Sequence, residues 1–433
     1  MDMILVASLV LVALIVLLLG AGLWVSVSLL AVGMAMMQLF TSAPMGSLIA
    51  STLWDSSWSW ALTSLPLFIW MGEILFRSNL SSSMFNGLSS WVGRMPGGLL
   101  HVNILGCGVM AAITGSSAVT CATIGRMSVP ELNGRGYPKA LTIGTLAGSG
   151  TLGLLIPPSI IMIVYGVTAE QSIAHLFIAG VVPGLLLIVL FMAYTGISSV
   201  LRGDEMPGRE AVIDLGQRIR ALRSLLPAVA LIVFVIGSIY GGLATPTEAA
   251  AIGVLGALAL SALGGSLSRA SFVDGVMSAV RTSCMISFII ATAACLSIAV
   301  AFVDLPRQLA GWVAGMELSP YLLLAVLGVL ILAMGCFLEG ISIIVLTSSV
   351  MLPMVEAAGI DLVWFGIFLV ILIEAAQITP PVGFNLFVLQ GITGESILTI
   401  ARAALPFFLL LVLLLVLITV FPWLATGLPQ LMS

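Results

Sequence analysis

Two glycine–serine sites and two double prolines are the features of this 433-residue sequence that could do chemistry. The first half contains Gly115-Ser116-Ser117 and Pro157-Pro158, and the second contains Gly340-Ile341-Ser342 and Pro380-Pro381. A proline removes a backbone donor and disfavours the helical conformation of the residue before it, so each pair should leave helix carbonyls without donors. The carbonyls concerned are those of Gly153, Leu154, Ala376 and Gln377. A dehydrated cation could satisfy such oxygens, as could neighbouring side chains or a water molecule.

The glycine–serine sites are suited to tight reversals of the chain. Glycine permits the reversal, and a serine at the start of a half-helix can cap its open N–H groups or turn its oxygen toward a ligand. Half-helices would begin after Gly115, Gly340, Pro158 and Pro381. Each start carries about half a positive charge, so together they could bind a carboxylate without a buried Lys or Arg, while freed carbonyls hold Na⁺.

The composition places these sites in a membrane. Charged residues make up 7% of the chain and apolar residues 61%, with a mean hydropathy of +1.25, whereas soluble proteins carry about 25% charged residues. This excludes a soluble enzyme, a nucleic-acid binder and a disordered scaffold. With about 20 residues per crossing, the length allows about a dozen spans. Residues 3–19 are predicted to form the first span. The five cysteines and two histidines lack the spacing of metal ligands, so we expect no transition metal and no cofactor.

The two halves of the chain repeat each other. The double prolines are offset by 223 residues, the glycine–serine sites by 225, and Pro183 matches Pro406 at 223. Between the halves lies a charged stretch with five Arg. We therefore predict a first repeat at 1–201, a cytoplasmic linker at 202–224 and a second repeat at 225–433.

The distribution of basic residues predicts that the repeats are inverted. Arg126, Arg135 and Lys139 follow the first glycine–serine site, but the matching region of the second half has no basic residue. We expect re-entrant hairpins at about 97–130 and 319–357, entering from opposite sides, and broken helices at about 137–166 and 362–391. The predicted fold is an all-α polytopic membrane protein whose inverted-topology repeats each contain a hairpin and a discontinuous helix, the layout of a secondary transporter.

At these residues the sequence resembles the large membrane subunit of tripartite ATP-independent periplasmic (TRAP) transporters. The segments that carry the resemblance are Gly115-Ser116-Ser117-Ala118, the run from Gly148 to Ser159, Gly180-Val181-Val182-Pro183-Gly184, and the run from Thr379 to Asn385. The resemblance implies an elevator-type transporter in the bacterial inner membrane, driven by Na⁺ as the coupling ion. It also implies two partners, a small four-helix membrane subunit, here expected to be a separate chain, and a periplasmic binding protein that delivers a carboxylate such as a dicarboxylate.

Site residues follow as hypotheses. The first ion site is expected to involve Ser116, Ser117, Gly153 and Pro157, and the second Gly340, Ser342, Gln377, Thr379 and Pro380. Substrate would lie between the hairpin tips, near Gly115, Ser117, Ser342 and Asn385.

Three acids lie in apolar surroundings. Glu73 is four residues before Arg77, which favours an ion pair on the helix surface. Glu339 and Glu374 could each coordinate a cation or carry a proton. A stand-alone sodium–anion symporter with the same two-hairpin plan is the main alternative function. Two other functions are disfavoured. An intramembrane hydrolase would need a general base beside its nucleophilic serine, and neither histidine is expected near the glycine–serine sites. A channel would not need two symmetric helix breaks.

Overall fold

The computed structural model describes residues 2–78, 87–207, 216, 226–315, 319–381 and 383–431, and every regular element in these ranges is a helix. Several helices begin at a side-chain cap, because a serine, threonine or aspartate accepts a hydrogen bond from a free N–H of the first turn. Thr245 with Glu248 forms a complete capping box at the start of α13, and Asp361 accepts the N–H of Trp364 at 2.7 Å at the start of α18. The all-α fold predicted from composition is confirmed.

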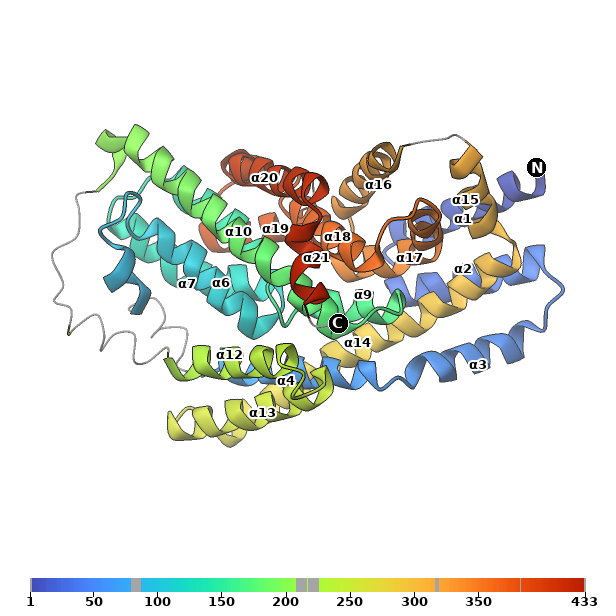
Figure 1. The fold of residues 1–433 in the computed structure, drawn as a ribbon, viewed down its shortest axis with the longest axis horizontal. Coiled ribbons are helices and arrows are strands. Elements are labelled where there is room, and N and C mark those ends of the chain that lie inside the picture. Colours follow the sequence, from blue (N-terminus) through green and yellow to red (C-terminus); the bar gives the residue numbers. More distant parts are fainter. Residues whose placement is uncertain are drawn as a thin grey trace.

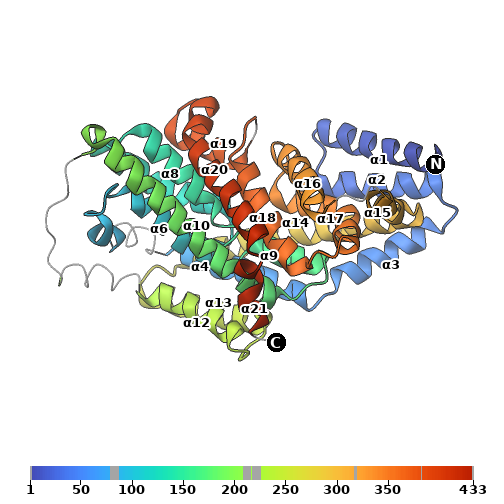
Figure 2. The same ribbon diagram turned by 45° about the horizontal axis from the view of Figure 1, so that its top comes forward.

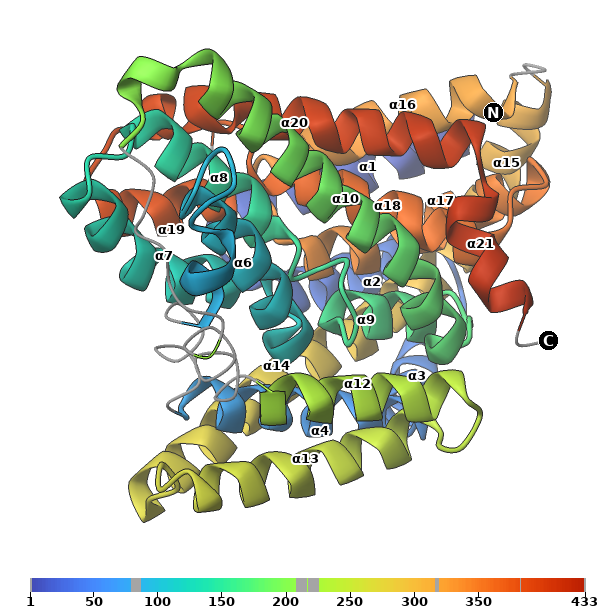
Figure 3. The same ribbon diagram turned by 60° about the vertical axis from the view of Figure 1, so that its left-hand side comes forward.

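One group of helices packs around the long helix α14 (Figure 1). α14 contacts α2, α3 and α4, and α13 contacts α4 and α12. The bounds of this group are α1 (Asp2–Gly20), α2 (Val25–Phe40), α3 (Met45–Ser57), α4 (Ser64–Phe76), α12 (Leu226–Tyr240), α13 (Pro246–Leu263), α14 (Arg269–Phe302) and α15 (Leu305–Gly315). In Figure 3, α12 and α13 form the lower edge of the molecule.

A second group contains the helices that carry the glycine–serine sites and the double prolines. Its bounds are α6 (Leu100–Thr114), α7 (Ser117–Gly134), α8 (Lys139–Thr151), α9 (Ile160–Thr168), α10 (Ile173–Leu201), α16 (Pro320–Gly335), α17 (Gly340–Ala357), α18 (Leu362–Gln377), α19 (Phe384–Thr393), α20 (Ile397–Val420) and α21 (Trp423–Gln430). Short 3₁₀ turns, η1 (Ala61–Thr63) and η2 (Gly203–Glu205), complete the described elements. Figure 2 shows α20 and α10 running beside each other across this group.

The first and second halves interlock inside this second group. α8 packs on α7 and also on α20, and α19 packs on α7. The contact between α8 and α20 is close because α8 presents glycines: a Cβ on Gly144 would lie 2.4 Å from the carbonyl oxygen of Ala403, and one on Gly148 would lie 2.6 Å from the Phe407 ring. A side chain larger than hydrogen would force the two helices apart.

Five described helices are long and apolar enough to cross a membrane, and a sixth crossing is possible if α3 and the segment from η1 through α4, bent by 57°, form one span. Shorter apolar helices of 10–17 residues account for much of the remaining hydrophobic sequence. Broken and re-entrant elements of this kind explain why the chain contains many short apolar helices beside a few complete spans.

Three differences from the predicted elements have physical causes. α3 was not expected, because its serines and Asp55 weaken the apolar pattern, and it carries Trp54, which is 77% exposed. The continuous apolar sequence of 282–303 predicts a helix there, but α14 begins thirteen residues earlier, at Arg269, because Arg269, Asp274 and Arg281 interrupt the apolar pattern of its first turns. The apolar sequence of 399–425 predicts one helix, but it is divided into α20 and α21 near Pro422. Most of the predicted linker at 202–224, and Val382 in the second double-proline segment, lie outside the described residues.

Candidate functional site

The first hairpin turns at Gly115, between α6 and α7. Gly115 has φ +58°, the left-handed conformation that glycine adopts without strain, and Ser116 is extended. The hydroxyl of Thr114 donates to the carbonyl of Met110 at 3.0 Å and shares a 2.9 Å hydrogen bond with Thr120 across the tip. The serine oxygen does not cap α7, so it remains available to a neighbour.

The first broken helix lies directly against this tip. The amide of Ile160, at the start of α9, donates to the carbonyl of Gly115 at 3.4 Å. A Cβ added to Gly153 would lie 2.5 Å from the carbonyl carbon of Ser116 and 2.7 Å from the amide nitrogen of Ser117. Only glycine allows the backbones of the break and the tip to approach this closely, so the two form one packed unit.

The first double proline interrupts the helix as predicted: α8 ends at Thr151, α9 begins at Ile160, and the Pro157-Pro158 peptide is cis. Of the two carbonyls expected to lose their donors, that of Leu154 accepts the Ser159 hydroxyl at 2.5 Å. The Gly153 carbonyl has no donor among the described residues. Of the two carbonyls predicted to lose their donors at this break, one is therefore unpaired.

The second double proline behaves in the same way. α18 ends at Gln377, α19 begins at Phe384, and the Pro380-Pro381 peptide is cis. The Ala376 carbonyl accepts the amide of Thr379 at 3.1 Å, whereas the backbone carbonyl of Gln377 has no donor within the described part of the chain. At each break one of the two predicted carbonyls is thus unpaired, and these two belong to residues expected to bind ions.

The second hairpin has a longer turn, from Cys336 to Glu339, between α16 and α17. Glu339 is the N-cap residue of α17 but makes no side-chain cap. The Cys336 thiol donates to the Pro380 carbonyl at 3.3 Å, which joins this tip to the second break. Gly340 lies against Ile161 of α9 and Ile373 of α18, where a Cβ would come within 2.7 Å of both side chains.

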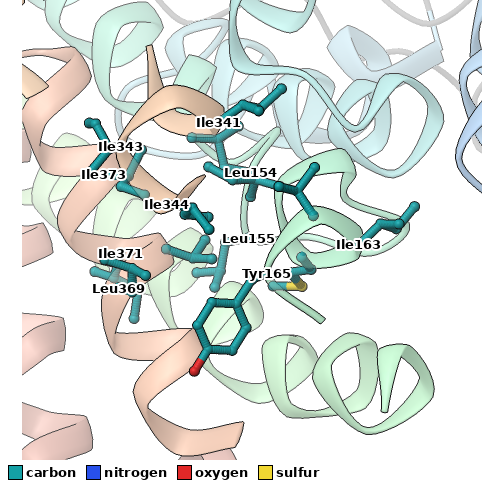
Figure 4. Packing of buried hydrophobic residues seen from close by; sticks show 14 of the residues in the cluster. Leu154, Leu155, Ile163, Tyr165, Ile341, Ile343, Ile344, Leu369, Ile371 and Ile373 are labelled. Carbon is teal, nitrogen blue, oxygen red and sulfur yellow. The ribbon is translucent and has the colours of Figure 1, made fainter. Parts of the chain in front are cut away.

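Apolar side chains hold the first break against α17 and α18. Figure 4 shows Leu154 and Leu155 of the break packed beside Ile341 and Ile344 of α17, with Ile371 of α18 nearby. All of these residues are at most 8% exposed. This packing fixes the distance between the first broken helix and the second hairpin.

One hydrogen bond crosses between the repeats at this place. The Ser117 hydroxyl, at the start of α7, donates to the side-chain oxygen of Gln377, at the end of α18. The two residues are 260 positions apart in the sequence and are 3% and 4% exposed. A buried polar pair of this kind ties the first hairpin tip to the second break.

A cavity of about 80 Å³ lies between the two hairpin tips. Five of the predicted site residues line it: Gly115, Ser116, Ser117, Gly340 and Gln377. Its volume suits an ion with a few waters, whereas sites for small organic ligands occupy about 300–1,000 Å³. In this conformation the cavity is therefore too small for an organic acid.

The other predicted site residues do not line this cavity. Gly153 lies behind Ser116, and the Thr379 hydroxyl donates to the Ala375 carbonyl at 2.7 Å. Ser342 is 4% exposed, and Asn385 is fully buried with neither atom of its amide hydrogen-bonded in the described structure. Pro157 and Pro380 shape the two breaks.

Several residues that line the cavity could not be identified from the sequence as site residues. One side is formed by Thr282, Met285 and Ile286 of α14. In the sequence, Thr282 is one hydroxyl in a long helix, and no pattern distinguishes it from the others. Glu339, which the sequence did indicate as a possible cation ligand, also lines the cavity and brings a carboxylate to it.

A second, larger cavity of about 700 Å³ lies between α3, α14, α17 and the end of α9. Hydroxyl residues dominate its polar lining, including Thr52, Ser297 and Ser348, and Asp55 and Glu170 add acidic groups. Neither cavity has Lys, Arg or His among its described lining residues. This one is large enough to hold a small organic molecule.

The acids outside the cavities have distinct settings. Glu73 pairs with Arg77 at 3.0 Å, as predicted, and accepts the Ser278 hydroxyl of α14 at 2.6 Å. This joins α4 to α14. Glu374 is fully buried in α18.

Two hairpin tips and two broken helices that meet at one cavity, within an apolar helical fold, define a secondary transporter. The protein family described as "Tripartite ATP-independent periplasmic transporter, DctM component" matches residues 11–424, so the chain belongs to this family. It is accordingly a permease subunit and not an enzyme, and it is a multi-pass protein of the bacterial inner membrane.

The sequence is similar to those of known TRAP permeases over most of their length. The C4-dicarboxylate TRAP transporter large permease protein DctM of Pseudomonas aeruginosa is 34% identical over 383 residues, 88% of this chain and 89% of that protein. The protein of the same name from Rhodobacter capsulatus is 33% identical and covers 99% of this chain and 100% of its own length. The crystal structure of the Alcanivorax borkumensis YdaH transporter, described as having an unusual topology, superposes with a TM-score of 0.67 at 15% identity. It covers 94% of this chain and 98% of that chain, and this likeness shows the fold alone.

Proposed function

We propose that this chain imports an organic acid across the inner membrane, driven by the entry of Na⁺, as the large subunit of a three-part transporter. The observation that carries the Na⁺ proposal is the pair of unpaired carbonyls, Gly153 and Gln377, one at each break. Gly153 packs against the first hairpin tip at Ser116, and Gln377 lines the central cavity together with the second tip. Oxygen ligands in a dehydrated setting suit a hard cation such as Na⁺.

The carboxylate part of the proposal rests on the half-helices and on the relatives. α7 and α17 begin at the cavity, so their positive ends would face a bound anion there. The two DctM relatives are named as C4-dicarboxylate permeases. A C4-dicarboxylate is therefore the first substrate to test.

The partners follow from the family. A small four-helix membrane subunit would bind the scaffold, and a periplasmic binding protein would deliver the substrate. Transport by an elevator movement would carry the group containing both hairpins past α4 and α14. The 80 Å³ volume supports a movement of this kind, because the cavity must widen before it can accept an organic acid.

The test is uptake of radiolabelled succinate into proteoliposomes that contain this chain. Four conditions are compared: with or without an inward Na⁺ gradient, and with or without the small membrane subunit and the periplasmic binding protein. We expect uptake only when all three proteins and the gradient are present. Uptake by this chain alone would support a stand-alone sodium–anion symporter, and gradient-independent uptake would disprove the Na⁺ proposal.

A crosslinking experiment tests the elevator. Thr282→Cys on α14 and Ile341→Cys at the second hairpin face the same cavity, so a crosslink should form and should stop uptake reversibly. Full transport in the crosslinked protein would argue against movement between the two groups of helices.

A further inference from the structure

We propose that Glu374 is a proton-binding site inside the permease, between the two broken helices, and that it loses and regains its proton during the transport cycle. The proposal goes beyond Na⁺-driven import and depends on that proposed function only for its transport measurement. The proton would come from water and return to water, with one O–H bond formed and broken and no redox change.

The geometry isolates the carboxyl group. Glu374 lies three residues before the end of α18 and is 0% exposed. Neither of its oxygens has a hydrogen-bond partner among the described residues. A buried polar group without a partner is uncommon in native proteins and needs an explanation.

The surroundings of Glu374 favour the neutral acid over a carboxylate that holds a metal ion. The backbone amide of Leu155, in the first break, lies beside the carboxyl group. That amide already donates to the Leu152 carbonyl at 3.2 Å. A backbone N–H carries partial positive charge, so it would repel a cation on the same side. The preference of this group for its neutral form rests instead on its burial and on the absence of a countercharge among the described residues.

No countercharge compensates an ionised Glu374 within the described part of the chain. The titratable residues on the helices packed against α18 are Lys139, Tyr165, His175, Tyr194, Tyr321, Glu356 and Arg402. Those at the turns adjoining these helices are Arg135, Tyr137, Glu170, Arg202, Cys336, Glu339, Asp361 and Glu395.

Each of these groups is accounted for elsewhere or makes no contact with Glu374. Lys139 pairs with Glu395 at 3.1 Å, the Tyr165 hydroxyl donates to the Leu362 carbonyl, and Cys336 donates to Pro380. None of these residues is hydrogen-bonded or ion-paired to Glu374. An unpaired charge at this depth would be strongly disfavoured, so the resting form is the protonated acid.

The first repeat shows that the fold does not require an acid here. Thr151 occupies the equivalent position at an offset of 223 and is also 0% exposed. Its hydroxyl is satisfied locally by the Gly148 carbonyl at 2.8 Å. The second repeat carries an ionisable group where a threonine suffices in the first, which argues for a role other than packing.

Because of its position, ionisation of the Glu374 carboxyl group would affect both broken helices. Glu374 lies one turn from Gln377, which bonds to Ser117, and beside Leu155, next to the cavity residue Leu154. When the hairpins separate and water reaches this region, the carboxyl can ionise. It must be reprotonated before the dry arrangement described here can form again.

The first measurement is independent of transport. Infrared spectra of the purified wild-type protein at neutral pH should contain the C=O stretch of a protonated carboxylic acid, and Glu374→Gln should lose that component. Thr151→Val is the matched control and should keep it. If Glu374→Gln leaves the band unchanged, Glu374 is ionised and the proposal is wrong.

The second measurement is the pH profile of Na⁺-driven uptake with all three subunits. Wild-type uptake should change by up to about ten-fold per pH unit on the limb where one proton is gained or lost, since a single group titrates there. Glu374→Gln should remove that limb. Thr151→Val should retain it.

Other results would overturn the proposal in recognisable ways. If the band is lost but the pH profile keeps its limb, Glu374 is a permanently neutral acid. A rise of about ten-fold or more in the Na⁺ concentration for half-maximal uptake, without a change in the pH profile, would make Glu374 a cation ligand. If Glu374→Gln does not fold, Glu374→Asp provides the test, since its acid band should shift and the limb should move. Absence of Na⁺-driven uptake by the wild type would contradict the proposed function and leave the infrared result standing.

Discussion

The two hairpin tips occupy equivalent places in the repeats but are built differently. The first turns on a single left-handed glycine, is braced by the Thr114 hydroxyl, and touches its break through backbone at Gly153. The second turns over four residues and contacts its break through the Cys336 thiol. Glu339, the counterpart of Thr114, makes no side-chain cap, and Phe337 beside it is 69% exposed.

This difference shows that repetition in sequence does not produce equal rigidity. Backbone contacts and buried hydroxyls hold the first tip in one arrangement, whereas the second tip has fewer fixed partners. We infer that the first tip is the more rigid wall of the cavity and that the second is the easier one to move. The following substitutions test this contrast.

The largest effect is expected for Gly153→Ala. Its Cβ would overlap the Ser116 carbonyl, and because the obstacle is backbone, the first tip must separate from its break. We expect a loss of about 1–3 kcal/mol in stability and of most Na⁺-driven uptake. Gly391→Ala, where no atom lies within 4 Å of the added Cβ, is the control. Equal behaviour of the two variants in thermal denaturation and uptake would contradict the rigid first tip.

Ser117→Ala should have the next largest effect. It leaves the Gln377 side-chain oxygen buried without its donor, a penalty of about 1–3 kcal/mol. Uptake at low Na⁺ should fall about ten-fold, and Ser342→Ala, whose residue does not line the cavity, should fall less. A double-mutant cycle of Ser117→Ala with Gln377→Leu should give a coupling energy of about 0.5–3 kcal/mol. Additive effects would mean that the two residues act separately.

Glu339→Gln should act through charge and leave the fold intact. Removing one carboxylate near a cation costs about 1 kcal/mol in a solvated setting, so the Na⁺ concentration for half-maximal uptake should rise about two- to five-fold. The shift should shrink when choline chloride raises the ionic strength, because salt screens the interaction. An unchanged Na⁺ concentration for half-maximal uptake at low salt would show that the Glu339 carboxylate does not attract the ion.

The smallest effect is expected for Tyr165→Phe. The Tyr165 hydroxyl of α9 donates to the Leu362 carbonyl at 2.7 Å and links the first repeat to the start of α18, away from both tips. Its loss should cost about 1 kcal/mol and lower the melting temperature by at most about 2 °C, without a change in Na⁺ dependence. Tyr194→Phe keeps its ring against Phe407 and is the matched control. A changed Na⁺ concentration for half-maximal uptake in Tyr165→Phe, but not in Tyr194→Phe, would show that contacts away from the hairpin tips also affect ion binding.

The breaks and turns could be predicted because single residues cause them. Consecutive prolines remove donors wherever they occur, and a glycine in a reversal is a local requirement, so Pro157-Pro158, Pro380-Pro381 and Gly115 indicated the correct places. Which carbonyls remain unpaired was only half predictable. Leu154 and Ala376 find donors in Ser159 and Thr379 through the local path of the chain after each break.

Contacts between distant segments could not be predicted from one sequence. The bond from Ser117 to Gln377 depends on how two hairpins meet, and the lining by Thr282 depends on where α14 crosses them. α3 was missed for a different reason: Thr52, Asp55 and Ser56 face a large cavity, so the helix lacks a continuous apolar pattern. Polar positions that serve a cavity weaken the periodicity by which helices are recognised.

The close fit of α8 to α20 has a consequence for the order in which the chain is made. Gly148 is synthesised 259 residues before its partner Phe407. Until then the glycine face of α8 has no matching surface, and the first hairpin has no support on that side. Most of the chain must therefore be synthesised before the first half can complete its packing. A protein truncated before Phe407 should be degraded by the quality-control proteases of the cell.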